Sequence, residues 1–184
     1  DNEPVEVTTA ALQDKDAMIY RIKTALLKDG RAKIRIRLPY PTGKHADAAA
    51  DFTKPERHQS RIVLSDGHAA IIEHTLDSTR YYLKLNWAGK GELARMAEHD
   101  YALTTTDDVL TLKAEYLANI NIKKDKYANY IPEPVIVYDQ ELKSVLKAWN
   151  RWWNEGAIVD FSECTDPRAK EFERRVVLSQ YLTQ

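Results

Sequence analysis

The chain has 184 residues, a formal net charge of −1 and 43% hydrophobic residues. This length and composition predict one or two ordinary globular domains, and the balanced charge gives no electrostatic reason to bind nucleic acid or an anionic membrane. No apolar run approaches the ~20 residues that a membrane span requires, and no signal peptide is recognisable at the N-terminus. Because Cys164 is the only cysteine, the chain has no internal disulfide.

The first half of the chain is typical of short strands. Residues 1–16 are polar and irregular, with a short strand expected over 5–9, and alternation predicts strands over 18–26 and 31–38. The turn residues 28–30, Lys-Asp-Gly, predict a tight hairpin between these two strands. In the second strand, apolar residues alternate with Arg and Lys over eight residues. Its basic face is either a binding surface or a solvated face paired with acidic residues of a neighbouring strand.

Further strands follow with turns every 8 to 12 residues. We expect them over 61–65 and 68–76, joined at Asp66-Gly67, then over 80–87, 93–103 and 109–117. Residues 93–103 also fit helical spacing in part, and we interpret them as a strand with a bulge. Seven or eight short strands of this kind are typical of an antiparallel sandwich. Residues 118–138 then form a connector, in which Pro132 and Pro134 prevent a continuous helix.

Two amphipathic helices are predicted near the C-terminus. The first, over 142–156, has Asp139 as its expected N-cap and Gly156 at its end. Its apolar residues follow the spacing of one buried helical face and are Leu142, Val145, Leu146, Trp149, Trp152 and Trp153. A short strand is expected over 157–161. The second helix, over 167–184, opens with Asp166-Pro167 and ends on its own apolar face, so we expect it to continue beyond Gln184.

Strands first and helices last predict the α+β class rather than alternating βαβ units. We therefore expect an antiparallel β-sandwich over residues 1–133, followed by a linker helix and the start of a helical domain over residues 134–184.

The order of elements near the C-terminus resembles one known junction. These elements are the helix with the W-x-x-W-W pattern, the short strand, the acidic turn and the helix with Glu173-Arg174-Arg175. It is that of glycoside hydrolase family 65, the maltose and kojibiose phosphorylase group, and related bacterial hydrolases. In that group a galactose-mutarotase-like β-sandwich is joined by linker helices to a catalytic (α/α) six-hairpin barrel. The resemblance implies that this chain is the non-catalytic N-terminal portion of an inverting glycoside hydrolase or phosphorylase, inactive by itself and beginning inside a larger sandwich.

The same resemblance implies a carbohydrate and the missing barrel domain as partners, and no cofactor. No residue here matches the catalytic motifs of that group, so no catalytic residue is assigned. Many bacterial members are exported, which makes the periplasm or the exterior candidate compartments. The sugar, its linkage and the choice between hydrolysis and phosphorolysis stay open. The alternative is a stand-alone β-sandwich module that binds a glycan or a protein.

The stretch over 39–60 is the candidate site, because about twenty residues without periodicity are typical of a functional loop. We expect Lys44, His45 and Asp47 to lie near the sugar, against the alternative of an ordinary surface loop. His45 and Asp47 could ligate a metal together with His58, but their irregular spacing does not favour it, so no metal ligand is assigned. His74 is expected to be a hydrogen-bonded core histidine. His99 and Asp100 should point to opposite faces of a strand.

The tryptophans of the first helix carry a second hypothesis. Trp149, Trp152 and Trp153 could stack on sugar rings, but they share the apolar stripe and so favour packing against a neighbouring domain. Without the barrel, the same stripe would bury against a second copy of the chain and form a homodimer.

Overall fold

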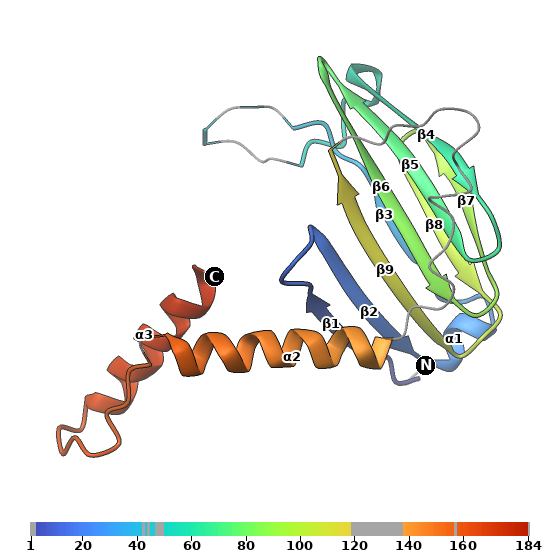
Figure 1. Ribbon diagram of the computed structural model, residues 1–184. Coiled ribbons are helices and arrows are strands. Elements are labelled where there is room, and N and C mark those ends of the chain that lie inside the picture. Colours follow the sequence, from blue (N-terminus) through green and yellow to red (C-terminus); the bar gives the residue numbers. More distant parts are fainter. Residues whose placement is uncertain are drawn as a thin grey trace. The chain divides into compact units, whose positions relative to one another are not determined.

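The computed structural model describes residues 3–41, 43, 45–46, 50–118, 138–156 and 158–183. Two compact units form, Asp1–Leu142 and Lys143–Gln184, here called the β unit and the helical unit (Figure 1). The domain boundary predicted between residues 133 and 134 lies outside the described residues.

Two antiparallel sheets make up the β unit. The larger has the strand order β1-β2-β9-β6-β5-β4, and the smaller has the order β3-β8-β7. The larger sheet consists of β1 Glu6–Ala11, β2 Ala17–Lys23, β4 His58–Ser65, β5 Ala69–Leu76, β6 Thr79–Ala88 and β9 Val109–Leu117. The smaller sheet consists of β3 Ile34–Arg37, β7 Gly91–Ala97 and β8 Asp100–Thr105.

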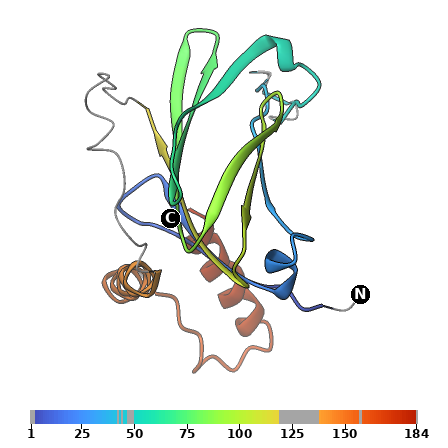
Figure 2. The same cartoon turned by 90° about the vertical axis from the view of Figure 1, so that its right-hand side faces the viewer.

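The apolar core lies between the two sheets, which face each other in Figure 2. Alternate residues of each strand contribute to it because successive side chains of a strand point to opposite faces. The core residues from the strands, beyond the small alanines, are Ile22, Ile72, Leu83, Leu85, Trp87, Leu93, Tyr101, Leu103, Leu110 and Leu112. The predicted α+β class, an antiparallel sandwich followed by helices, is confirmed.

The predicted hairpin at residues 28–30 is wrong. Strand β2 ends at Lys23, and a short helix, α1 Ala25–Lys28, follows with Thr24 as its N-cap. The chain then crosses to the smaller sheet, where β3 pairs with β8 rather than with β2. The one-turn helix α1 directs the chain to the other sheet, whereas a two-residue turn would pair β3 with β2.

The basic face of β3 is paired with an acidic neighbour. Arg35 Nε donates to Asp100 Oδ1 of the adjacent strand β8 at 2.9 Å. Of the two alternatives for this face, the pairing with acidic residues is the one observed at Arg35.

The segment predicted as one strand over 93–103 is a hairpin of two strands. Strand β7 has the expected bulge, between Arg95 and Ala97, and the chain reverses at His99, which has a left-handed φ of 56°. The long aperiodic stretch is also shorter than expected, since the 3₁₀ turn Pro55–Arg57 leads directly into β4 at His58. Strand β9 has the predicted bounds.

The described helices of the C-terminal part are α2 Tyr138–Glu155 and α3 Ala169–Leu182. Asp139 lies within α2 rather than at a cap, and it forms an ion pair with Arg21 of β2 at 3.2 Å. Residues 158–161 contain no strand, because such a short extended segment needs a hydrogen-bonded neighbour that it lacks. The start of α3 follows Pro167 by two residues, since Asp166 Oδ1 accepts from Arg168 N at 2.8 Å in a local turn. None of the described helices has the length and apolar character that crossing a bilayer demands.

Candidate functional site

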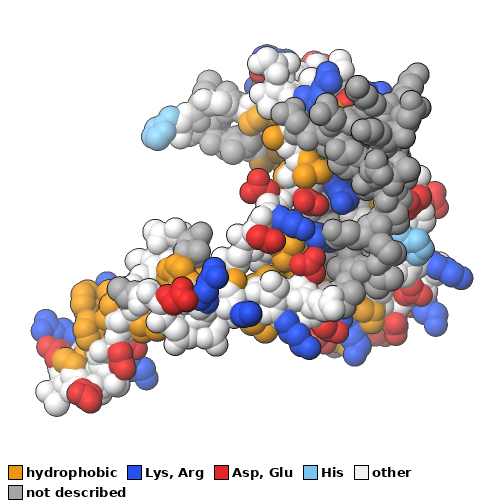
Figure 3. Space-filling model, in the orientation of Figure 1, with side chains coloured by type: hydrophobic (Ala, Val, Ile, Leu, Met, Phe, Trp, Pro, Cys, Tyr) orange, Lys and Arg blue, Asp and Glu red, His pale blue; other side chains and the backbone are white. Residues whose placement is uncertain are grey.

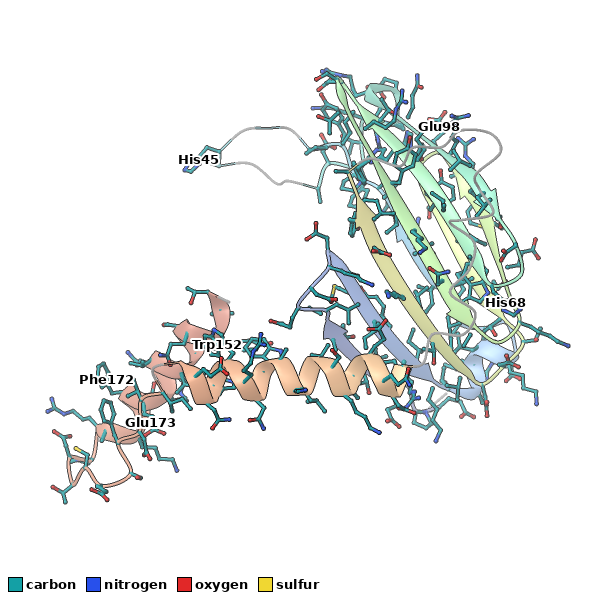
Figure 4. All side chains as sticks on the ribbon, in the orientation of Figure 1. His45, His68, Glu98, Trp152, Phe172 and Glu173 are labelled. Atoms are coloured by element: carbon teal, nitrogen blue, oxygen red, sulfur yellow. The ribbon has the colours of Figure 1, made fainter. Side chains whose placement is uncertain are left out.

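The predicted sugar-proximal residues do not form a described site. Lys44 and Asp47 lie outside the described residues, and His45 is exposed in a turn (Figure 4). No hydrogen bond joins His45 to another described residue. Their proposed role therefore stays a prediction.

Three other histidines come together at one end of the sandwich. His58 opens β4, His74 lies on β5, and His99 occupies the turn between β7 and β8. All three are buried, and one potential ligand atom from each lies within 4.8 Å of those of the other two. We call them the histidine cluster. It includes His58 but not His45, which sequence reasoning had grouped with it.

Strand register brings the first two histidines together. Antiparallel pairing of β4 with β5 sets His58 opposite Leu76 and Ser60 opposite His74. Residues two apart on a strand share a face, so His58 and His74 meet diagonally across the pair. The third histidine arrives from the smaller sheet, because the tight turn before β8 turns its ring toward β4. The ring centroids of His58 and His99 are 3.6 Å apart.

A hydrogen-bonded relay runs from Tyr81 to His58. The hydroxyl of Tyr81, on β6, is 2.6 Å from His74 Nδ1, and His74 Nε2 is 2.6 Å from His58 Nδ1. Both nitrogens of His74 are therefore partnered, which agrees with the expected core histidine. Either direction of proton donation along the relay satisfies all three groups.

His99 belongs to a second network, whose proton positions follow from its partners. Its Nε2 lies 2.9 Å from the carbonyl oxygen of Pro55, which can only accept, so this nitrogen carries a hydrogen. In the neutral ring, Nδ1 then accepts from Ser60 Oγ at 2.8 Å, and Ser60 Oγ accepts from the Tyr101 hydroxyl at 2.7 Å. The network satisfies polar groups that would otherwise be costly to bury.

Burial keeps the first two histidines neutral. It lowers the pKa of His74 to about 4, and the nearby charge of His58 and His99 acts in the same direction. Burial, followed by the charge of His99, also lowers the pKa of His58. Tyr81 stays protonated, because burial and the neighbouring Tyr116 raise its pKa to about 12.

A polar pocket of about 400 Å³ lies against the cluster, at the end of the β unit where Glu98 is labelled in Figure 4. His58, Ser60 and His99 form part of its wall. The other residues around it come from the 3₁₀ turn and from β4, β5 and the β7–β8 hairpin. They are Pro55, Glu56, Gln59, Arg61, Glu73, Thr75, Arg95 and Glu98.

Charged side chains of opposite sign meet in this pocket. Arg61 Nε lies 2.9 Å from Glu73 Oε1. Burial by itself would raise the pKa of Glu73, but the hydrogen bond and charge of Arg61, together with the Tyr82 hydrogen bond and the charge of Arg80, lower that pKa. The pocket thus presents carboxylates, guanidinium groups, hydroxyls and imidazoles around one polar space, which suits a ligand rich in hydroxyl groups.

A second hollow of about 380 Å³ lies between the two sheets and is lined mainly by apolar side chains. The lining includes Met18 and Tyr116, whose exposed fractions are 39% and 51%. Part of the inner face of β2 and β9 is therefore left uncovered by the smaller sheet.

The tryptophans of α2 pack within the helical unit. Trp149 stacks on Tyr181 of α3 with ring centroids 5.2 Å apart, and Trp152 and Trp153 meet edge to face at 4.4 Å. Several large apolar residues of the helical unit stay exposed, as Figure 3 shows for the hydrophobic side chains gathered over this unit. The exposed large ones are Leu146, Ile158, Phe172, Leu178, Tyr181 and Leu182.

Sequence reasoning missed the histidine cluster because it grouped His58 with His45 of the same loop and judged His74 and His99 separately. The spacings from His58 to His74 to His99 match no metal or catalytic motif. The predicted hairpin at Asp66-Gly67 was the one signal that could have placed His58 beside His74. However, its turn residues are Gly67-His68, and a bulge shifts the strand register between Ile62 and Leu64. Such one-residue shifts decide which side chains share a face.

No protein-family model and no curated protein matches this chain.

Proposed function

We propose that the β unit is the non-catalytic, carbohydrate-binding portion of a carbohydrate-active enzyme, an inverting glycoside hydrolase or phosphorylase. The polar pocket beside the histidine cluster carries this proposal. A sugar offers neighbouring hydroxyl groups that each donate and accept, and the Arg61–Glu73 pair places a donor and an acceptor 2.9 Å apart at the pocket wall. Shape and polarity together favour a mono- or disaccharide.

The order of elements and the uncovered inner face give further support. The sandwich of the family 65 group is larger than nine strands, and the apolar hollow between the sheets is where additional strands would pack. In this proposal, the helical unit is the linker and first helix of the barrel, and the catalytic residues lie in the barrel.

Titration of the purified chain with maltose and kojibiose, followed by amide resonances, tests the binding. We expect shifts confined to β4, β5 and the β7–β8 hairpin. Arg95→Ala and Glu98→Gln should each weaken binding about 10- to 100-fold, because each removes one charged hydrogen bond worth about 1.5–3 kcal/mol. His68→Gln, at the opposite end of the strands (Figure 4), is the matched control.

Two results would argue against the proposal. Binding that is equally strong in the Arg95, Glu98 and His68 variants would place the sugar elsewhere. A gene that does not continue past Gln184 into paired helices with conserved carboxylates would remove the barrel enzyme and leave a stand-alone module.

The exposed apolar surface of the helical unit supports a second candidate, a protein-binding module. Phe172, Tyr181 and Leu182 are 57%, 53% and 71% exposed. Large apolar patches on soluble proteins commonly mark protein interfaces. The occupant is the barrel domain in the enzyme proposal, and a second copy in the homodimer proposal through Trp149, Trp152 and Trp153.

Sedimentation equilibrium distinguishes these occupants. A homodimer should dissociate when Leu182→Ser and Phe172→Ser are combined. A chain that sediments as a monomer at every concentration rules the homodimer out.

A further inference from the structure

We propose that His58, His74 and His99 form a metal-binding site with Zn²⁺ as its preferred ion. This inference stands apart from the proposed glycan binding. Three imidazoles and an open fourth position are an established ligand set for zinc. One nitrogen from each ring already lies within 4.8 Å of the other two. Zinc–nitrogen bonds of about 2.0–2.1 Å in a tetrahedral site require ligand atoms about 3.3 Å apart, so only small shifts of the nitrogens are needed.

Two of the rings are held by partners of the kind that orient metal ligands. The Tyr81 hydroxyl lies 2.6 Å from His74 Nδ1, and the Pro55 carbonyl oxygen accepts from His99 Nε2 at 2.9 Å. Metal-binding histidines commonly use one nitrogen for such a bond and the other for the ion. The nitrogens that would bind an ion are then His74 Nε2 and His99 Nδ1, and His99 Nδ1 exchanges its hydrogen bond from Ser60 Oγ for the bond to the ion.

His58 is the ring that adjusts. Its Nδ1 lies 2.6 Å from His74 Nε2, a hydrogen-bond distance at which the two nitrogens share one proton. An ion replaces that proton and pushes the two nitrogens apart. The ring of His58 also stacks on His99 with 25° between the planes, whereas an ion lies close to the plane of each imidazole that binds it. His58 must therefore turn, and no described residue hydrogen-bonds its Nε2 to oppose this.

The ligand set selects the class of ion. Within the described part of the chain, no carboxylate or thiol hydrogen-bonds to any of the three rings, so the donors are neutral imidazoles alone. Imidazole suits zinc, copper and nickel, whereas magnesium and calcium prefer oxygen ligands. The pocket supplies the fourth position, either from Ser60 Oγ, which is 2.8 Å from His99 Nδ1, or from water.

The test uses the full chain without a polyhistidine tag. Zn²⁺ titration is followed by calorimetry, and Co²⁺ by visible absorption, which reports the coordination geometry. We expect one ion per chain, a tetrahedral cobalt spectrum and a higher Tm with Zn²⁺. His58→Gln should weaken Zn²⁺ binding more than about 100-fold, beyond the effect of losing an orienting partner. His68→Gln removes an exposed histidine at the other end of the strands and should change nothing.

A second variant covers the event that losing a buried ring impairs folding. Tyr81→Phe keeps the aromatic ring but removes the hydroxyl that orients His74, and should weaken Zn²⁺ binding about 10- to 100-fold while the circular dichroism spectrum is unchanged. The proposal is wrong if wild-type protein binds no stoichiometric Zn²⁺. It is also wrong if folded His58→Gln and Tyr81→Phe bind as tightly as His68→Gln. Because no sugar enters these measurements, their failure does not touch the glycan proposal.

Discussion

In the β unit, most large apolar residues that alternate along the strands are enclosed between the sheets, whereas in the helical unit several large apolar side chains, most of them on α3, stay exposed. Trp87 and Tyr101 are 2% and 0% exposed, while Tyr181 is 53% exposed. The same kind of pattern in the sequence, apolar residues on one face, therefore has two outcomes. A strand face finds its partner inside the sandwich, and a helical face of this size requires one that the helical unit does not itself provide.

The largest difference between the units should appear on truncating a tryptophan. Trp87 packs in the core and its Nε1 donates to the Gly67 carbonyl at 2.9 Å. Trp87→Ala should lower the free energy of unfolding by about 3–5 kcal/mol, and Trp152→Ala by about 1 kcal/mol or less. Urea unfolding measures both, followed by the β-sheet circular dichroism signal for Trp87→Ala and by the helical signal for Trp152→Ala. Equal losses would mean that the comparison between the units does not hold.

The second-largest difference between the two units should be the effect of acid on their stability. Because burial lowers the pKa of His74 to about 4 from its usual 6.5, the unfolded chain binds a proton more readily than the folded one. The stabilising contribution of neutral His74 is therefore complete above pH 6.5 and is lost as pH falls toward 4, by up to about 3 kcal/mol.

Urea unfolding of the metal-free protein at intervals from pH 7 to 4 checks this. The decrease in unfolding free energy from pH 7 to pH 4 should be smaller in His74→Gln than in wild type, and unchanged in His68→Gln. The helical unit has no histidine, so the exchange rates of its amides, corrected for intrinsic pH dependence, should stay level across this window. A wild-type slope that His74→Gln preserves would assign the effect to other groups.

A smaller effect is expected at Ser60. Its hydroxyl lies between His99 Nδ1 and the Tyr101 hydroxyl, so Ser60→Ala leaves two polar groups without that partner. The expected loss is about 1–2 kcal/mol of unfolding free energy. Ser65→Ala removes an exposed hydroxyl from the same strand and should cost almost nothing. Similar losses in both variants would show that the buried network adds no stability.

The smallest effect concerns α3. Glu171 bonds Arg174 and Arg175, and these hydrogen bonds lower its pKa to about 2. Its contribution is present above the ordinary pKa of 4.5 and is lost as pH falls toward 2. Amide exchange of α3 should be slightly faster in Glu171→Gln than in wild type at pH 7, and the difference should shrink at pH 3. Identical exchange at pH 7 would mean that these ion pairs do not hold the helix.

Local sequence patterns were sufficient where the elements adjacent in the chain are of the same type. The alternation at 109–117 gave β9 with its bounds, and the order of strands and helices gave the fold class. Local sequence patterns failed where a segment distant in the sequence determines the structure. Nothing near residues 28–30 shows that β3 pairs with β8, about 65 residues later. Residues 158–161 have the composition of a strand but no neighbouring strand among the described residues.

The candidate site was harder to predict than the fold, for the same reason. The histidine cluster joins two sheets through the β4–β5 register and the left-handed turn at His99. Neither the bulge at Ile62–Leu64 nor the reversal within 93–103 has a clear local signature, so the sequence alone could not place these three rings together.

The strand order also has a consequence for how the protein is made. Strand β2 lies between β1 and β9, and Ala17 pairs with Glu115. On the ribosome, the first hairpin therefore emerges with one edge bare, and its partner follows almost a hundred residues later. At about 5–20 residues per second, that edge waits several seconds before the larger sheet closes. Until then, the hydrogen-bonding groups along that edge of β2 have no partner from β9.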